Sequence, residues 1–343
     1  MTRRRLAFHS LWVATLVAGA LAPPRGVDAA PVLLASEEIR VESGSSVVTG
    51  ILRRPVEGSR LPGIVLLQSD GPLHSGAAQT WSDSLATRGY AVLSIAVVGL
   101  DDDAARVETG LWQTLGADAA AAAKALRAHE SVGNTVGVLA SGRATWALPH
   151  AAALDSTLAF AVALAGGPLG LAEQELYRRK QNLVADRYEP ANVERGGSIV
   201  WVYFLYLKSG GTERIESVRR EYERYRLEPW FHLLELPTED PTSTKWPPER
   251  TQFALALNYN PLPVFATMQL PLLAVLGADD RVWPAMATAG AYESLKKPNV
   301  TVRTLEGADH EFRRRDEASG GSQAAEVFGI IDAWIRSVAA PSP

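Results

Sequence analysis

The stretch from Val136 to Ala153 has the pattern that positions a nucleophile in many hydrolytic sites. It reads VGVLASGRATWALPHAAA, an apolar run, a turn of small residues and an alanine-rich amphipathic segment. This pattern predicts a strand, a sharp turn and a helix. A nucleophile elbow needs small residues two positions before and after the nucleophile, because the strained turn leaves no room for larger side chains. Ala140 and Ala144 meet that need, so the expected nucleophile position is Gly142.

Gly142 has no side chain that could attack a substrate. The nearest hydroxyl belongs to Ser141, whose neighbours two positions away, Leu139 and Arg143, are bulky for a tight elbow. The sequence therefore has the frame of a serine hydrolase without a nucleophile at the expected place. Two other interpretations stay open. Glycine suits any strand-to-helix turn that needs a positive φ, and Ser141 is either a displaced nucleophile or a small polar residue beside the turn.

Composition limits the class of protein. A chain of 343 residues with 47% hydrophobic residues can bury one large α/β core with an inserted subdomain, or two domains, and we favour the first. A net charge of -4 gives no basic field for nucleic acid, so no nucleic-acid partner is expected. The absence of cysteine excludes disulfides and thiolate metal sites. No two histidines have metal-ligand spacing, and we predict neither a metal nor a cofactor.

The N-terminus has the pattern of a secretory signal. Three arginines at 3–5 precede an apolar region at 6–22 and a small-residue cleavage pattern at 27–29. We predict a signal peptide at 1–29 and an exported protein, periplasmic or extracellular. The alternative is a retained membrane anchor. Polar residues inside the apolar region and a Pro-Pro pair soon after it weigh against that, so no stable membrane insertion is expected after signal removal.

Apolar runs of strand type alternate with helical segments along most of the chain. Strands are predicted at 39–41, 47–52, 64–67, 90–98, 158–165, 270–276 and 300–305, and helices at 77–88, 111–129, 285–295 and 323–338. The alternation predicts an α/β fold with a mostly parallel sheet flanked by helices.

The character of the sequence changes between residues 168 and 268. Charged and aromatic residues become frequent, and helical segments are predicted at 173–186, 199–207 and 213–225. We predict a helical cap at 168–268, inserted into a core made of 30–167 and 269–343. Such an insertion would lie as a lid over the carboxyl ends of the strands.

The elbow and two later loops follow strands in a characteristic order. The loops are Gly277-Ala278-Asp279-Asp280 and Gly307-Ala308-Asp309-His310. In this arrangement the chain resembles the α/β-hydrolase superfamily, and more narrowly the secreted bacterial esterases and serine-aminopeptidase-like hydrolases with a helical cap. The resemblance covers about residues 38–336. It implies that Asp280 is the acid and His310 the base that takes a proton from a serine hydroxyl, while the acid fixes the histidine tautomer.

The chain departs from these relatives at other polar positions. Where relatives read His-Gly-Ser-Gly-Pro, the chain has Gln68-Ser69-Asp70-Gly71-Pro72. The resemblance implies that Ser69, Asp70 and Arg143 form the oxyanion region, where a carboxylate at Asp70 would repel developing negative charge. Ala96 and Val98 stand where relatives place an Asp and an Arg.

These features predict an exported α/β-hydrolase-type protein in which catalysis is lost or strongly impaired at Gly142. Its role would be to bind a small apolar or acyl ligand under the cap, or a protein partner whose identity the sequence does not indicate. The alternative is an active esterase or peptidase that uses Ser141 with His310 and Asp280.

Overall fold

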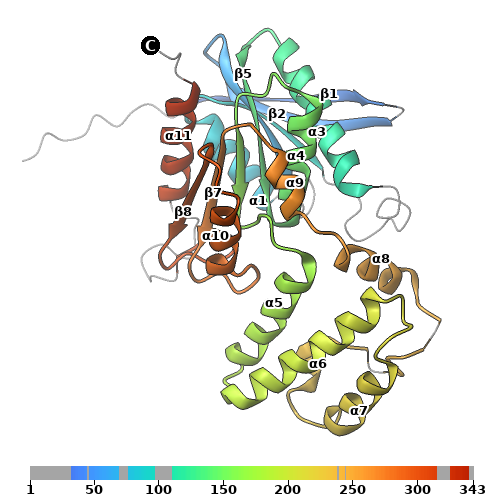
Figure 1. Cartoon of the computed structure of the whole chain (residues 1–343). Coiled ribbons are helices and arrows are strands. Elements are labelled where there is room, and N and C mark those ends of the chain that lie inside the picture. Colours follow the sequence, from blue (N-terminus) through green and yellow to red (C-terminus); the bar gives the residue numbers. More distant parts are fainter. Residues whose placement is uncertain are drawn as a thin grey trace, which may run out of the picture. The chain divides into compact units, whose positions relative to one another are not determined.

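The computed structural model describes residues 32–44, 46–68, 76–96, 110–237, 239–243, 245–314 and 325–339. Within these ranges the strands form a single sheet in the order β1-β2-β4-β3-β5-β6-β7-β8 (Figure 1). The strands are β1 Leu34–Ser43, β2 Ser46–Pro55, β3 Leu61–Gln68, β4 Ala91–Ala96, β5 Val132–Ser141, β6 Ala161–Leu164, β7 Leu272–Gly277 and β8 Val300–Leu305.

Six of these strands, from β4 to β8 in spatial order, pair in parallel, whereas β1 pairs antiparallel with β2 and β2 antiparallel with β4. The two predicted N-terminal strands and the mostly parallel sheet are therefore confirmed. Because β5, β6, β7 and β8 are parallel neighbours, the loops that follow them leave the sheet at the same edge. This places the elbow and the two later loops together.

Helices cover both faces of the sheet (Figure 1). The described helices are, in chain order, α1 Gly76–Ala86, α3 Leu111–Ala128, α4 Leu148–Leu154, α5 Leu171–Ala185, α6 Pro190–Lys208, α7 Ile215–Tyr225, α8 Pro248–Leu257, α9 Leu262–Thr267, α10 Ala285–Ser294 and α11 Ala325–Ala339, with short 3₁₀ helices η1 Gly142–Ala147 and η2 Phe231–Leu234.

Two hydrophobic cores hold these helices to the sheet. In β3, Ile64 and Leu66 enter the core formed with α1 and α11, whereas Val65 and Leu67 enter the core formed with α3. All four side chains are buried. This alternation follows from the two-residue period of a strand. Ala119, Ala122 and Ala123 of α3 are fully buried in the core formed with α3, and their small side chains allow a close approach between the helix and the sheet.

The helices α5 to α8, which we call the insertion helices, form a packed group around a buried cation. The guanidinium of Arg179 in α5 lies 5.2 Å from the ring centre of Phe204 in α6 and 5.7 Å from that of Phe253 in α8. It also donates to the carbonyl of Leu234 in η2 at 2.8 Å. Burial lowers the pKa of this arginine. The predicted helical character of this region is confirmed, while the boundaries of the cap stay a prediction.

The predicted signal peptide lies outside the described residues. In the part of the chain that the structure does describe, the helices are all too short or too polar to cross a bilayer.

The loop after β6 is pressed against the elbow. A Cβ on Gly166 would lie 2.2 Å from the carbonyl oxygen of Gly142 and 2.7 Å from Oγ1 of Thr145. Gly166→Ala is therefore expected to lower the free energy of unfolding by about 2 kcal/mol, because backbone must move to admit the methyl group. The control is Gly290→Ala in α10, where a Cβ meets nothing within 4 Å and alanine should add about 1 kcal/mol. Urea unfolding of both variants tests this, and equal stabilities would contradict it.

Candidate active site

Asp280 and His310 form a hydrogen-bonded pair at the carboxyl edge of the sheet. His310 Nδ1 lies 2.7 Å from Oδ2 of Asp280, whose side chain is only 1% exposed. The other carboxylate oxygen accepts the backbone N–H groups of Val282 and Trp283, each at 2.7 Å. Because an ionised carboxylate only accepts hydrogen bonds, this geometry assigns the ring proton to Nδ1. Nε2 is then the unprotonated nitrogen that can accept a proton. The loops after β7 and β8 thus build an oriented imidazole.

Gly142 lies beside this imidazole. It follows β5 with φ +53, in the left-handed region that glycine adopts without strain. A Cβ built on Gly142 would lie 4.0 Å from Nε2 of His310, and among the described residues outside its own turn it would meet no other heavy atom within 4 Å. A hydroxyl one bond further out would come within hydrogen-bonding reach of the ring. The space for a nucleophile is therefore present, and the residue there carries none.

Ser141 occupies a different environment. It is the last residue of β5, with extended backbone at φ -118 and ψ 152, and its Cα pairs with that of Leu164 in β6. Successive strand residues face opposite sides of the sheet, so Ser141 shares the side of Leu139, which belongs to the core formed with α1 and α11. Among the described residues none forms a hydrogen bond with its hydroxyl. The structure brings Gly142, Asp280 and His310 together and leaves Ser141 one residue before the turn.

The oxyanion region is described only in part. The backbone N–H of Arg143 lies in the first turn of η1, where N–H groups have no partner inside the helix. That is the position of one oxyanion donor in a nucleophile elbow. Ser69 and Asp70, and with them the departure at Val98, lie outside the described residues.

Side chains that the sequence did not single out fix the turn around Gly142. The buried Thr145 hydroxyl donates to the Gly142 carbonyl at 2.6 Å, and Trp146 Nε1 donates to the Gly167 carbonyl at 2.8 Å. Both residues belong to η1, and both are fully buried. They couple the elbow to the loop after β6. A polar side chain three residues after the elbow glycine was the one available signal for Thr145.

Helix α5, one of the insertion helices, is hydrogen-bonded to the loop that carries Asp280. The Tyr177 hydroxyl donates to the Asp280 carbonyl at 2.7 Å, and the Gln174 amide donates to the Val282 carbonyl at 3.1 Å. Burial, followed by the nearby charge of Asp280, raises the pKa of Tyr177. The spacing of these two residues puts them on one face of α5. Their helix is rich in charged residues, so its sequence does not predict that this face is buried.

A cavity opens beside the elbow, between the core and the insertion helices. It has a volume of about 410 Å³, and its wall comes from α3, η1, α5 and α8. The residue after Gly142, Arg143, and the buried Trp146 both line it. We call this space the elbow cavity.

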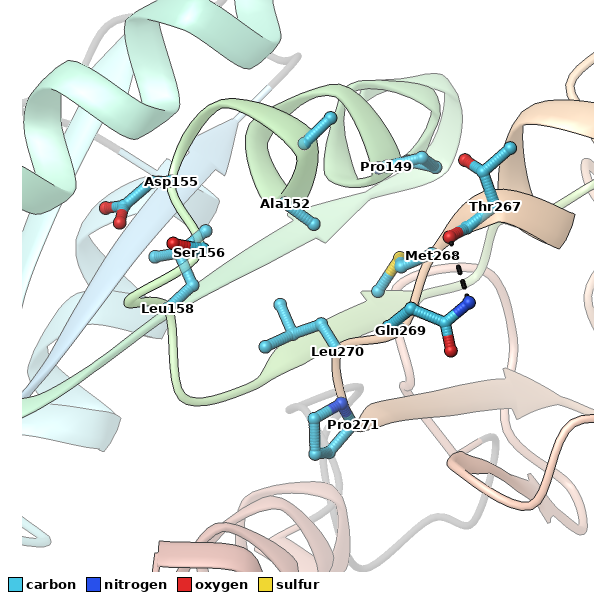
Figure 2. A pocket seen from close by; sticks show the side chains of 11 residues that line it. Pro149, Ala152, Asp155, Ser156, Leu158, Thr267, Met268, Gln269, Leu270 and Pro271 are labelled. Atoms are coloured by element: carbon cyan, nitrogen blue, oxygen red, sulfur yellow. Dashed lines mark hydrogen bonds between the residues drawn. The ribbon is translucent and has the colours of Figure 1, made fainter.

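A second cavity of about 430 Å³ lies far from the elbow loops along the strands. Figure 2 shows it between α4 and the segment that leads into β7, with Pro149 and Ala152 on one side and Met268 and Leu270 on the other. Leu158 and Pro271, which precede β6 and β7, also line it. It is therefore at the amino ends of these strands, opposite to His310, and we call it the distal cavity.

His150 in α4 gives the molecule a pH-dependent element. Its Nε2 lies 3.2 Å from the Tyr259 hydroxyl, and burial lowers the pKa of His150 from its ordinary value of 6.5. The unfolded chain therefore binds this proton more readily than the folded chain. The contribution of neutral His150 to stability is complete above pH 6.5 and is lost as the pH falls through the lowered pKa. His150→Asn should reduce the loss of stability between neutral and mildly acid pH in urea unfolding. Parallel pH profiles would contradict this.

Sequence and structure comparisons differ in what they find. Neither the protein-family models nor the curated proteins contain a match to this chain. Solved structures do match. The hypothetical protein PA2218 from Pseudomonas aeruginosa aligns with a TM-score of 0.54 at 14% identity, over 90% of this chain and 94% of that one. Est1E from Butyrivibrio proteoclasticus gives 0.52 at 13% identity, over 89% and 99%.

DcsB, solved in complex with its substrate analogue, gives a TM-score of 0.54 at 13% identity, over 88% of this chain and 99% of that one. Identities this low establish architecture rather than activity. The strand order, the helices on both faces and these alignments over most of each chain agree with one another. The chain has the α/β-hydrolase fold.

Proposed function

We propose that this chain is an exported relative of carboxylic-ester and peptide hydrolases in which catalysis is lost or strongly impaired, and that it acts by binding. One observation carries the proposal. Gly142 occupies the left-handed turn beside Nε2 of His310, where a serine would have to stand to be activated. The acid and base of such a site are held in place, and the group they would activate is missing.

The contribution of a serine nucleophile to kcat is large enough that its loss impairs catalysis severely. In a serine hydrolase, loss of the nucleophile lowers kcat on the order of a million-fold, and the other members of the triad recover almost none of it. That loss corresponds to about 8 kcal/mol of transition-state stabilisation. Binding interactions between the pocket and a substrate are not large enough to offset this loss. Turnover at a physiological rate would therefore need a nucleophile elsewhere.

Binding is supported by the elbow cavity. Its volume of about 410 Å³ lies within the range of small-molecule sites. Much of its wall is apolar or aromatic, which suits a small apolar or acyl ligand. The proposal of export rests on the N-terminal sequence pattern alone, and a protein partner remains the alternative to a small ligand.

The second candidate function is an active hydrolase with Ser141 as a displaced nucleophile. The observation in its favour is proximity, because Ser141 is the residue next to Gly142 and its hydroxyl has no partner among the described residues. A rearrangement of the turn would have to bring that hydroxyl from its strand position to His310.

Turnover assays separate the two candidates. Purified protein is incubated with p-nitrophenyl acetate, p-nitrophenyl butyrate and an aminoacyl p-nitroanilide, beside the variants Ser141→Ala and His310→Ala. The proposal predicts hydrolysis at background rate in all three proteins. Turnover that disappears in Ser141→Ala would establish the displaced nucleophile. Turnover that survives Ser141→Ala but needs His310 would overturn both candidates.

A further inference from the structure

Among the described residues that line it, the elbow cavity combines an apolar wall with a single unpaired cation. This inference rests on the proposed binding function and specifies its ligand. The apolar wall is contributed by α3, η1, α5 and α8 through Leu111, Trp112, Trp146, Leu171, Phe253 and Ala256. Trp112 and Trp146 pack edge to face with ring centres 4.8 Å apart, so this part of the wall is rigid. The wall suits the hydrocarbon or aromatic body of a ligand.

Two of the arginines in the cavity wall are already paired with carboxylates of the protein. Arg178 is bonded to Glu175 at 2.9 Å and to Glu235, and Arg179 reaches Glu175 at 3.5 Å and the Leu234 carbonyl at 2.8 Å. Two guanidinium groups thus face two carboxylates. This network joins α5 to η2 and leaves no net charge for a ligand.

Arg143 differs from these two arginines. It lines the same cavity from η1, it is half-buried, and in the described part of the chain it forms no ion pair and no side-chain hydrogen bond. The remaining charged residue of the wall, Glu249, is exposed in the first turn of α8, where the helix dipole and water both stabilise a carboxylate. The two side chains are not within ion-pair distance of each other. The inner, uncompensated charge that the described residues give the cavity is therefore positive.

We infer that the elbow cavity binds a monocarboxylate with an apolar body, and that Arg143 pairs with its carboxylate. A guanidinium matches a carboxylate with two parallel hydrogen bonds, and partial burial strengthens the pair. One cation balances one negative charge, which favours a carboxylate over a phosphate dianion. The acyl chain or aryl ring then lies against Trp112 and Trp146. The ligand class is that of the acid released by ester hydrolysis, held next to Gly142 without being formed there.

Binding of sodium octanoate, kept below its micelle concentration, tests the inference by isothermal titration calorimetry. 1-Octanol serves as the uncharged probe of equal chain length. We expect the parent to bind octanoate at least about tenfold more tightly than octanol, the discrimination that one charge-assisted pair provides. Arg143→Met should lose this preference while octanol binding is kept. Arg143→Lys should retain part of it, which separates loss of charge from misfolding. Arg220→Met, on the exposed side of α7, is the matched control and should leave both affinities unchanged.

Two blocking variants locate the site. Ala256→Trp places a large side chain in the elbow cavity, and Ala152→Trp does the same in the distal cavity. The inference predicts that only Ala256→Trp abolishes octanoate binding. It is overturned if Arg143→Met binds octanoate as tightly as the parent, if the parent does not bind octanoate, or if only Ala152→Trp abolishes binding. Absence of both turnover and octanoate binding would leave the proposed loss of catalysis standing. Octanoate binding together with Ser141-dependent turnover would instead overturn the proposed function and keep the carboxylate site.

Discussion

Gly142→Ser is expected to give the protein an esterase activity of at least about a hundredfold over the parent, since the added hydroxyl would be the missing member of a triad whose absence lowers kcat on the order of a million-fold. The Cβ of this serine would lie 4.0 Å from Nε2 of His310, and the described residues outside the turn leave space around it. The imidazole is already oriented by Asp280 at 2.7 Å. The expected gain is below the full effect because the sequence predicts a carboxylate, Asp70, in the oxyanion region, where it would repel developing negative charge.

The controls for Gly142→Ser separate chemistry from strain. At φ +53 a residue with a Cβ costs about 1 kcal/mol of stability, so the variant should unfold at a slightly lower urea concentration. Gly142→Ala should show the same loss of stability with no activity. Adding His310→Ala to Gly142→Ser should return hydrolysis of p-nitrophenyl butyrate to background. A stable Gly142→Ser protein with no more turnover than Gly142→Ala would contradict the proposed geometry.

Asp280→Ala is expected to lower the free energy of unfolding by about 4 kcal/mol, because one buried and one partly buried backbone N–H group lose their acceptor and each such loss costs about 1 to 3 kcal/mol. The groups belong to Val282 and Trp283. Asp280→Asn keeps one acceptor oxygen for them and should lose about 2 kcal/mol. It would also present an amide donor to His310 and disturb the ring tautomer.

The matched control is His310→Ala. The histidine is more exposed than the aspartate, with 28% of its side chain accessible against 1%, so its removal should cost about 1 kcal/mol or less. In urea unfolding we expect Asp280→Ala to be the least stable of the three variants, Asp280→Asn to be intermediate and His310→Ala to be the most stable. Equal stability of Asp280→Ala and the parent would show that the carboxylate is not a structural acceptor in solution.

The sheet and its helices were largely predictable because their signals are local. The apolar run at 300–305 coincides with β8, and the alanine-rich segment at 111–129 coincides with α3 to within one residue. The chain turns directly after β5, with φ +53 at Gly142, and small residues on both sides are the local signal of such a tight turn. Its continuation differs in detail. The chain forms the 3₁₀ helix η1 before α4 begins at Leu148, with Pro149 in the first turn.

The region before β7 was harder to predict. No helix was expected at 248–257 or at 262–267, where the structure has α8 and α9. Pro248 stands at the start of α8, where the missing N–H of proline costs no helical hydrogen bond and its ring fixes a helical φ. A proline followed by a run of good helix formers was the signal that could have revealed α8.

The contacts that build the site arise from residues far apart in sequence. Tyr177 bonds to Asp280 across 103 positions, and Gln174 bonds to Val282 across 108. Arg143 and the insertion helices share a cavity for the same reason. Local patterns give the residue types available for such contacts. Which face of a charged helix is buried against which loop depends on the packing of the whole chain, and a single sequence holds no signal for it.

Covalent labelling shows directly whether the native chain holds an activated nucleophile, which we propose it lacks. The parent and Gly142→Ser are treated with a fluorophosphonate probe and their intact masses are measured, followed by peptide mapping. We expect an unmodified parent and a single adduct on residue 142 of the variant. A stoichiometric adduct on a serine of the folded parent, lost in His310→Ala, would contradict it.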